Sequence, residues 1–286
     1  MLSNRPQSPK EEECCGNSCN PCIFDVHKKL LKQWELKQLN LNNNNLLEPL
    51  VYKLFKVTKL KHLNNDYIKL VLSYNYDEQE LKDGRIILNP GQHVVINYLK
   101  WSKPFTPISW TDTTIKLLIR IYADGINTQR LKNLEIGEVI KVRGPYGDFN
   151  YARNKFKNII MFSIGSGLAV FLPIIKSIID DEEDETRVFL TAGFRSLDLV
   201  PMKKKLKLFT DYWNVQCTLY LTEGTSLNIN GIDIKHGRIN ERVCKSVLEN
   251  YLADCTLVLI CGTEEFNESL EQWVSECNFL NYYVFR

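Results

Sequence analysis

Apolar residues follow two different patterns in this 286-residue chain, and the change between them constrains the fold more than any other feature. From about Pro49 to Arg143, apolar and polar residues alternate in short runs. These runs are separated by turn residues such as Asn64-Asn65-Asp66. After about Arg153, continuous apolar runs alternate with stretches of helical periodicity. Short alternating runs predict antiparallel strands, and the later pattern predicts parallel strands joined by helices. The sequence therefore predicts a small antiparallel β barrel followed by a parallel-sheet α/β domain.

The expected elements follow from this periodicity. In the first part we expect strands over residues 53–58, 67–72, 93–98, 116–122 and 139–143. In the second part we expect strands over 158–163, 188–192, 216–222, 256–261 and 282–285, and helices over 168–179, 201–210, 240–251 and 266–277. A cysteine-rich segment with a short helix over 27–39 precedes both, and an asparagine-rich linker follows it. The predicted organisation is a module at 1–40, a barrel at 48–152 and an α/β domain at 153–286.

Composition excludes some classes of protein. Hydrophobic residues make up 44% of the chain and charged residues 24%, which are values of a globular protein. A net charge of +2 with dispersed basic residues gives no support to nucleic-acid binding. Nine cysteines and a polar, charged start from Met1 to Glu13 indicate a reducing compartment. We therefore expect a cytoplasmic protein, with a mitochondrial or other organellar location as the alternative.

One uncharged stretch, Ile159 to Ile175, approaches the length of a membrane span. A span needs about 20 mostly apolar residues, and this stretch contains Gly165, Gly167 and Pro173. We interpret it as a buried strand that turns into a helix over a glycine-rich corner, and we predict no transmembrane segment.

Two strand ends carry residue types suited to a nucleotide cofactor. Alternation along residues 116–122 places Arg120 and Tyr122 on one face of the predicted strand. A cation suits a phosphate, and a phenol ring suits a flat aromatic ligand. The alternative interpretation is an ordinary half-solvated strand. The corner at Gly165 and the Cys261-Gly262 corner each follow a predicted parallel strand, and ligands of open α/β sheets bind beyond such carboxyl ends. A small buried residue after a strand is the alternative for Cys261.

Several motifs in order resemble the ferredoxin-reductase-type flavoproteins, and NADH–cytochrome b5 reductases in particular. Lys103-Pro104-Phe105-Thr106-Pro107 resembles the Arg-Pro-Tyr-Thr-Pro motif of these reductases. The resemblance extends over residues 48–286 through the segments Ile119–Tyr122, Gly125–Thr128, Gly144–Phe149, Cys261-Gly262 and Tyr283–Phe285. It implies an FAD-binding barrel followed by an NAD(P)-binding domain.

The resemblance also implies roles for particular residues. Thr106 would contact the flavin edge near N5, and Cys261 would lie beside the nicotinamide, so these two are the implied catalytic residues. The cofactor-binding residues that it implies, besides Thr106, are Lys103, Pro104, Phe105, Arg120, Tyr122, Gly125, Ile126, Asn127, Thr128, Gly165, Ser166, Gly167, Gly262 and Phe285. Hydride would pass from NADH to FAD, and electrons would then pass singly to cytochrome b5 or another haem protein. We expect a monomer, and NADPH stays open as an alternative donor because Arg195, in a loop after the second strand of this domain, would suit a phosphate.

The chain departs from the family pattern at several positions. Lys103 stands for arginine, Phe105 for tyrosine and Thr263 for proline. The family's Gly-Gly-Thr-Gly-Ile-Thr-Pro becomes Ile164-Gly165-Ser166-Gly167-Leu168-Ala169-Val170, so Ala169 replaces a threonine that contacts flavin. Each change weakens a contact by about 1 kcal/mol, the net scale of a neutral hydrogen bond. The alternative hypothesis is a degenerate family member that acts as a binding protein.

The N-terminal segment Cys14-Cys15-Gly16-Asn17-Ser18-Cys19-Asn20-Pro21-Cys22 resembles the oxidoreductase-like N-terminal module. Cys14, Cys15, Cys19 and Cys22 are candidate ligands for zinc or an iron–sulfur cluster, since these metals are held by thiolates at such spacing. Reduced thiols in a flexible tail are the alternative. A metal-binding interaction protein, with its function in this segment, is therefore a second rival to the reductase.

Overall fold

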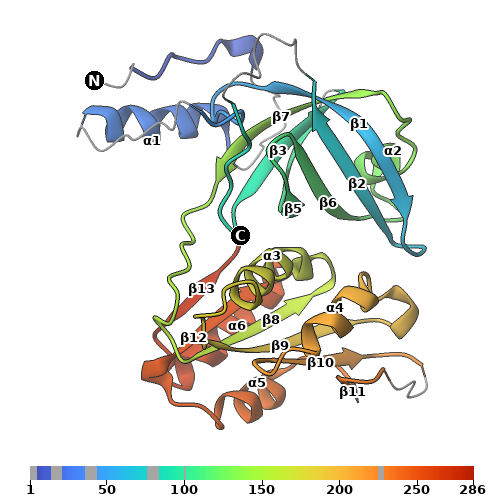
Figure 1. Ribbon diagram of the computed structural model, residues 1–286, viewed down its shortest axis with the longest axis vertical. Coiled ribbons are helices and arrows are strands. Elements are labelled where there is room, and N and C mark those ends of the chain that lie inside the picture. Colours follow the sequence, from blue (N-terminus) through green and yellow to red (C-terminus); the bar gives the residue numbers. More distant parts are fainter. Residues whose placement is uncertain (1–4, 14–20, 36–43, 76–83, 100, 225–228) are drawn as a thin grey trace. The chain divides into compact units, whose positions relative to one another are not determined.

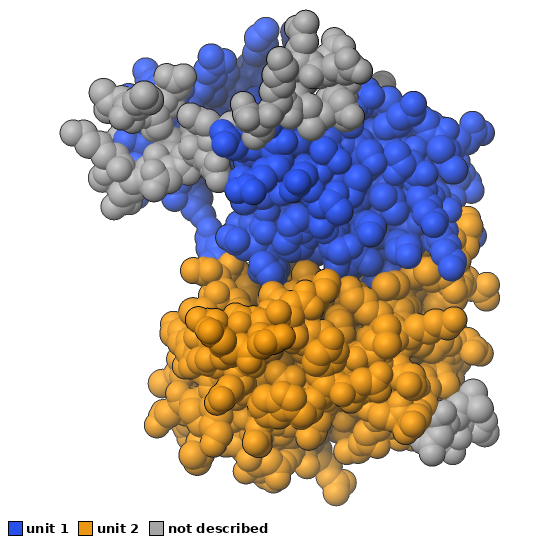
Figure 2. All heavy atoms as spheres, viewed as in Figure 1, with its two compact units in different colours: residues 1–61, 69–148 blue, residues 62–68, 149–286 orange. Residues whose placement is uncertain are grey.

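The computed structural model describes the chain except for residues 1–4, 14–20, 36–43, 76–83, 100 and 225–228 (Figure 1). The chain forms two compact units, coloured separately in Figure 2. The first unit comprises residues 1–61 and 69–148, and the second comprises residues 62–68 and 149–286.

The first unit is built on a 7-stranded sheet with the order β4-β3-β7-β1-β2-β6-β5. The pairs β1–β7, β3–β7, β3–β4 and β5–β6 run antiparallel. The strands are β1 (Lys53–His62), β2 (Tyr67–Tyr74), β3 (His93–Tyr98), β4 (Trp101–Phe105), β5 (Pro107–Trp110), β6 (Thr114–Arg120) and β7 (Val139–Tyr146). Alternate side chains of β1 and β2, among them Phe55, Val57, Leu70 and Leu72, are fully buried and form part of the core.

The two edges of this sheet are consecutive in the chain. β4 ends at Phe105 and β5 begins at Pro107, yet the two strands stand at opposite ends of the sheet order. Only Thr106 separates them, so the sheet curves until its edges meet, as in a closed barrel. The predicted antiparallel barrel is therefore confirmed, although the sequence did not predict β4 and β5. Pro104 and Pro107 obscured them, because proline is confined to edge strands, which is where these two residues lie.

A buried arginine ties the N-terminal segment to the barrel. Arg143 on β7 is 0% exposed, and its guanidinium donates to the Pro49 carbonyl at 3.2 Å and to the Pro21 carbonyl at 2.9 Å. Helix α1 (Ile23–Glu35) begins directly after this contact, four residues earlier than the sequence predicted, and Ile23 is buried. Lys29 of α1 forms an exposed ion pair of 3.0 Å with Asp148.

The second unit is built on a 6-stranded parallel sheet with the order β11-β10-β9-β8-β12-β13. Its strands are β8 (Asn158–Ile164), β9 (Arg187–Phe194), β10 (Val215–Leu221), β11 (Ile232–His236), β12 (Thr256–Cys261) and β13 (Tyr282–Val284). Its helices are α3 (Leu168–Ile179), α4 (Lys203–Thr210), α5 (Glu241–Leu248) and α6 (Glu264–Glu276). The α/β prediction is confirmed, but β11, a short edge strand, was not predicted.

Helices cover both faces of this sheet. From β8 the chain proceeds through α3 to β9, and from β12 it proceeds through α6 to β13 in the opposite direction across the sheet. Right-handed crossovers therefore place α3 and α6 on opposite faces. Residues of α5 and α6 pack on Ile160, Phe162, Val258 and Ile260, so the residues between these positions on β8 and β12 face α3.

The uncharged stretch from Ile159 to Ile175 forms β8, a 3₁₀ turn at Gly165–Gly167 and the first part of α3, as the sequence predicted. Among the described residues, no helix combines the length and the apolar character that crossing a bilayer requires.

Candidate functional site

The residues predicted to bind flavin lie where the barrel edges meet. Phe105 on β4 pairs with Val94, Pro104 with Val95 and Lys103 with Ile96. Lys103 is exposed, and it forms no ion pair with any residue that the structure describes. Phe105 and Thr106 are half-buried. This seam therefore presents a solvated cation, an aromatic ring and a hydroxyl along a few consecutive residues.

Arg120 and Tyr122 lie together at the end of β6. The guanidinium carbon of Arg120 is 5.1 Å from the centroid of the Tyr122 ring, and Tyr122 is 48% exposed. On the other face of this segment Leu117, Ile119 and Ile121 are buried, and Leu118, on the face of Arg120, is buried as well. Tyr122 lies two residues beyond Arg120, the last residue of β6.

The segment Gly125–Thr128, which the resemblance assigns to the cofactor site, is the start of a helix. Gly125 caps α2 (Ile126–Lys132), and the Thr128 hydroxyl accepts from the Tyr122 amide at 3.1 Å and donates to the Gly125 carbonyl at 3.0 Å. A hydroxyl has one proton to donate. In this arrangement Thr128 closes the loop and has no proton for a phosphate oxygen. The amides of Ile126 and Asn127 are first-turn donors, which lack acceptors within a helix.

These donors suit the chemistry of FAD. The cofactor has an anionic pyrophosphate and a flat aromatic ring system, and this unit offers an exposed ammonium, a guanidinium against a phenol ring, and helix-start amides. Cationic and amide donors bind phosphates, and aromatic faces bind flat rings.

In the second unit, the glycine corner and the Cys261-Gly262 corner lie side by side. The order of strands reverses between β8 and β12, which makes the carboxyl ends of these strands the topological switch point. Gly165 has a φ of +57°, a left-handed conformation that favours glycine. A Cβ on Gly167 would lie 2.0 Å from the Cys261 carbonyl oxygen, so the corner packs directly on that backbone. The two predicted segments are therefore in direct contact, with Gly165 and Gly167 buried and Ser166 partly exposed.

Cys261 and Ser163 are neighbours on the α3 face of the sheet. They pair in register, and both lie at the carboxyl ends of their strands. Burial raises the pKa of the Cys261 thiol to about 12, so the thiol is protonated at neutral pH. The Ser163 hydroxyl is fully buried and has no hydrogen-bond partner among the described residues. Ser163 is not among the predicted site residues, although a polar residue within a continuous apolar strand was a usable signal.

The glycine corner fits a dinucleotide. Its residues lead into a helix of 12 residues, whose N-terminal amides and dipole attract phosphate. Thr263, where the family has proline, begins α6 by accepting a hydrogen bond of 3.4 Å from the Phe266 amide. This departure has a structural role of its own, because threonine is a good N-cap residue.

Phe285, predicted to contact a cofactor, is a half-buried member of an aromatic cluster and contacts each of its other rings. Its ring centroid is 4.8 Å from that of Tyr283, 5.1 Å from that of Phe149 and 6.0 Å from that of Phe171. Its amide donates to the Ile260 carbonyl at 2.9 Å, and its carbonyl accepts from Asn267 at 3.1 Å. The C-terminal residues are thereby fixed against β12 and α6.

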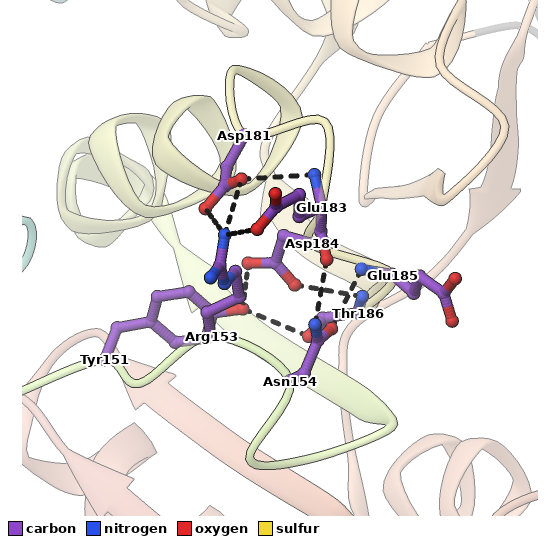
Figure 3. Close-up of polar contacts among 8 residues, drawn as sticks. All are labelled: Tyr151, Arg153, Asn154, Asp181, Glu183, Asp184, Glu185 and Thr186. Carbon is purple, nitrogen blue, oxygen red and sulfur yellow. Dashed lines mark hydrogen bonds and ion pairs between the residues drawn. The ribbon is translucent and has the colours of Figure 1, made fainter.

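A second polar cluster lies just before the amino-terminal ends of β8 and β9, at the other end of these strands from the glycine corner (Figure 3). The Tyr151 hydroxyl donates to the Asp184 carboxylate, and burial, followed by this bond, raises the pKa of Tyr151. Arg153 pairs with Asp181 and Glu183 on the same loop. The cluster joins the chain that leads into β8 to the acidic loop before β9, so its role is structural.

The buried thiols predict a loss of stability at high pH. Burial raises the pKa of Cys217, Cys244 and Cys261 from 9.0 to about 12. Above pH 9 the thiols of the unfolded chain ionise, whereas those of the folded chain stay neutral. The stabilising contribution of these thiols is therefore fully present below pH 9, and it is lost as the pH rises toward about 12. The urea concentration at the midpoint of unfolding should fall as the pH is raised over this range. Cys244→Ala should make this fall with pH less steep. A midpoint independent of pH would contradict the burial of these thiols.

Most of the predicted metal site lies outside the described residues, namely Cys14, Cys15 and Cys19. Cys22 carries a free thiol at the start of α1. Within the described ranges, no three metal-binding side chains come together.

Three protein families match consecutive parts of the chain. Residues 1–43 match the N-terminal domain of oxidoreductase-like proteins, residues 54–151 the oxidoreductase FAD-binding domain, and residues 161–272 the oxidoreductase NAD-binding domain. The FAD-binding match covers the barrel strands, and the NAD-binding match covers most of the parallel sheet.

Relatives and solved structures agree with these matches. The chain is 28% identical to "NADH-cytochrome b5 reductase-like" of Mus musculus over 94% of this chain and 90% of that protein, and 26% identical to the Homo sapiens protein of the same name over 93% and 89%. The fold is similar to that of the cytochrome b5 reductase domain of Ulva prolifera nitrate reductase, with a TM-score of 0.72 at 20% identity over 84% of this chain and 99% of that one. A barrel that matches the FAD-binding family, a parallel sheet that matches the NAD-binding family and relatives over nearly the whole length together make this chain a member of the cytochrome b5 reductase-like FAD- and NAD-binding oxidoreductases.

Proposed function

We propose that the protein is an NADH-dependent flavoprotein reductase whose electron acceptor is a haem protein such as cytochrome b5. The observation that carries this proposal is the direct packing of the Gly165–Gly167 corner on Cys261-Gly262 at the switch point of the sheet. When bound, FAD supplies the chemistry, since it takes up a hydride and releases electrons one at a time. The residues of the protein bind and orient the cofactors.

In the barrel, we propose that Lys103 faces the pyrophosphate, Phe105 packs along the flavin, and Thr106 donates to its edge. Pro104, Arg120, Tyr122, Gly125, Ile126 and Asn127 complete the proposed FAD site, and Thr128 supports it by closing the loop. In the α/β unit, the nucleotide would lie over Gly165, Ser166, Gly167, Cys261 and Gly262, with Phe285 packed nearby. Because the Cys261 thiol is neutral, it acts there as an apolar contact and not as a base.

NADH is favoured over NADPH by the surroundings of Arg195. The Nε of Arg195 donates to Glu223 at 2.8 Å, and both side chains are exposed at the carboxyl ends of β9 and β10. The cation that would meet a 2′-phosphate is therefore already paired with a carboxylate, whose charge repels a phosphate. Relatives described as NADH–cytochrome b5 reductases agree with this choice.

The remaining predictions depend on solution measurements. We propose that the protein is a monomer, that it lies in the cytoplasm, and that it has three parts, at residues 1–40, 48–152 and 153–286. Zinc or an iron–sulfur cluster at Cys14, Cys15, Cys19 and Cys22 is a separate proposal, which elemental analysis would test. Deleting residues 1–40 is a poor test of the N-terminal module, because it removes the Pro21 carbonyl that the buried Arg143 binds. Cys19→Ser with Cys22→Ser preserves that contact.

The experiment that tests the function is an absorption spectrum of the purified protein, followed by NADH and then NADPH without oxygen. A flavin band at about 450 nm that bleaches faster with NADH supports the proposal. If the purified protein neither contains nor takes up FAD, this result would favour the alternative hypothesis of a degenerate family member that acts as a binding protein. The departures from the family pattern at Lys103, Phe105 and Ala169 argue for that alternative.

Lys103→Glu should release FAD. The exposed ammonium has no carboxylate partner among the described residues, so charge reversal places a carboxylate where the pyrophosphate is proposed to bind. We expect FAD affinity to fall by at least about tenfold, the effect of losing one charge-assisted contact. Flavin fluorescence during titration measures it. Lys141→Glu, an exposed lysine on β7, is the matched control and should retain FAD. Equal affinity in both variants would place the pyrophosphate elsewhere.

A further inference from the structure

One helix of the α/β unit exposes a face that combines lysines with large apolar side chains. Helix α4 packs on β10 and β11, and its residues Leu206 and Phe209 are buried (Figure 1). Lys204 and Leu208 are four residues apart on the helix, and both are exposed. Residues at this spacing share one side of a helix, so the two lie together on the solvent side of α4.

The turn after α4 extends this exposed face. The Tyr212 amide donates to the Phe209 carbonyl at 3.2 Å, so the chain keeps turning beyond the helix and places Tyr212 four residues after Leu208. Trp213 follows directly. The exposed fractions are 61% for Leu208, 45% for Tyr212 and 69% for Trp213. Contiguous apolar surface that water reaches marks an interaction site, whereas a single exposed leucine does not.

The charge of this segment is positive. Residues 203–213 contain four lysines and one acid, Asp211. Lys204 and Lys207 are exposed, and neither forms an ion pair with any residue that the structure describes. The acidic loop before β9 is a neighbour, since Asn214 donates to the Thr186 carbonyl at 3.0 Å. Three carboxylates of that loop are already paired with cations: Asp180 with Lys176, and Asp181 and Glu183 with Arg153.

Five side chains, named the α4 face, make up this surface: Lys204, Lys207, Leu208, Tyr212 and Trp213. Tryptophan and tyrosine are enriched where a bilayer meets water, and lysines are attracted to anionic headgroups. Interfaces between proteins share the aromatic residues but are depleted in lysine. The composition of the α4 face therefore fits a lipid surface better than a protein partner.

We propose that the α4 face docks the protein on the surface of an anionic lipid bilayer. The leucine and the two aromatic rings enter the boundary between headgroups and acyl chains, and the two lysines bind the headgroups. The protein lies on the bilayer in this arrangement and does not cross it. The proposal is independent of the proposed reductase function, because it uses none of the residues assigned to the cofactors.

The test is cosedimentation of the full-length protein with vesicles of phosphatidylcholine, with and without phosphatidylserine. The wild type should bind the vesicles that contain phosphatidylserine, and salt should weaken this binding by screening the charges. Trp213→Ser and Leu208→Ser should each weaken binding at least about tenfold, the effect of leaving one large apolar side chain out of the bilayer. Lys204→Ala with Lys207→Ala should weaken binding about thirtyfold, since each lysine near an anionic surface contributes a factor of about five.

Matched controls remove the same groups at other places. Leu280→Ser replaces a leucine that is 83% exposed between α6 and β13, and it should bind like the wild type. Lys56→Ala with Lys141→Ala removes two charges from exposed positions on β1 and β7, and it should also retain binding. Thermal unfolding checks that every variant is folded, because substitutions of exposed residues change stability little.

Two results would overturn the proposal. One is a wild type that stays in solution with both kinds of vesicle at low salt. The other is binding by the α4 variants that equals binding by their matched controls. Loss of binding in the lysine variant on vesicles with phosphatidylserine, together with loss in the tryptophan and leucine variants, would support it.

Discussion

Gly167→Ala is expected to destabilise the α/β unit by more than about 3 kcal/mol, or to prevent it from folding. The added Cβ would lie 2.0 Å from the carbonyl oxygen of Cys261 and 2.6 Å from its carbonyl carbon. Both are backbone atoms of β12, which pairs with β8 over its whole length. Neither strand can move without breaking that pairing. Thermal unfolding of the isolated variant, compared with the wild type, measures the loss.

Ser166→Ala is the control for this substitution. It lies in the same 3₁₀ turn and already has a Cβ, so its melting temperature should stay near that of the wild type. If Gly167→Ala also melted like the wild type, the corner would not rest on the Cys261 backbone. The proposed nucleotide surface would then lose its structural basis.

Arg143→Ala is the second substitution with a large expected effect. Its guanidinium is fully buried and donates to the carbonyls of Pro21 and Pro49 and to the Tyr146 hydroxyl. Truncation leaves buried acceptors unpaired and opens a large cavity, and we expect a loss of about 3 kcal/mol or more. Urea unfolding measures the loss. Limited proteolysis should also cut the chain ahead of β1 faster, because the variant no longer holds Pro21.

Two comparisons sharpen this result. Lys141→Ala, on the same strand but exposed, should change stability by less than about 0.5 kcal/mol. Arg143→Lys keeps the charge but loses the fork that reaches two carbonyls at once, so it should recover only part of the loss. Proteolysis ahead of β1 at the wild-type rate in Arg143→Ala would show that other contacts hold the N-terminal segment.

Local pattern was sufficient for the regular elements of the α/β unit. Residues 168–179 were predicted as a helix and form α3, and residues 256–261 form β12. Buried strands and amphipathic helices carry strong periodic signals, so their type could be predicted. Edge elements carry weaker signals. β4, β5 and β11 are short edge strands, and α2, a helix of 7 residues, was not predicted either.

The sequence by itself determined the two fold types, their order, the glycine corner and the residue types of the proposed sites, because periodicity and motif order are properties of neighbouring residues. Only the tertiary structure decided that Gly167 rests on Cys261, that Arg143 binds Pro21, and that the Thr128 hydroxyl is used within its own loop. These contacts join atoms whose separation depends on how strands pair and helices pack.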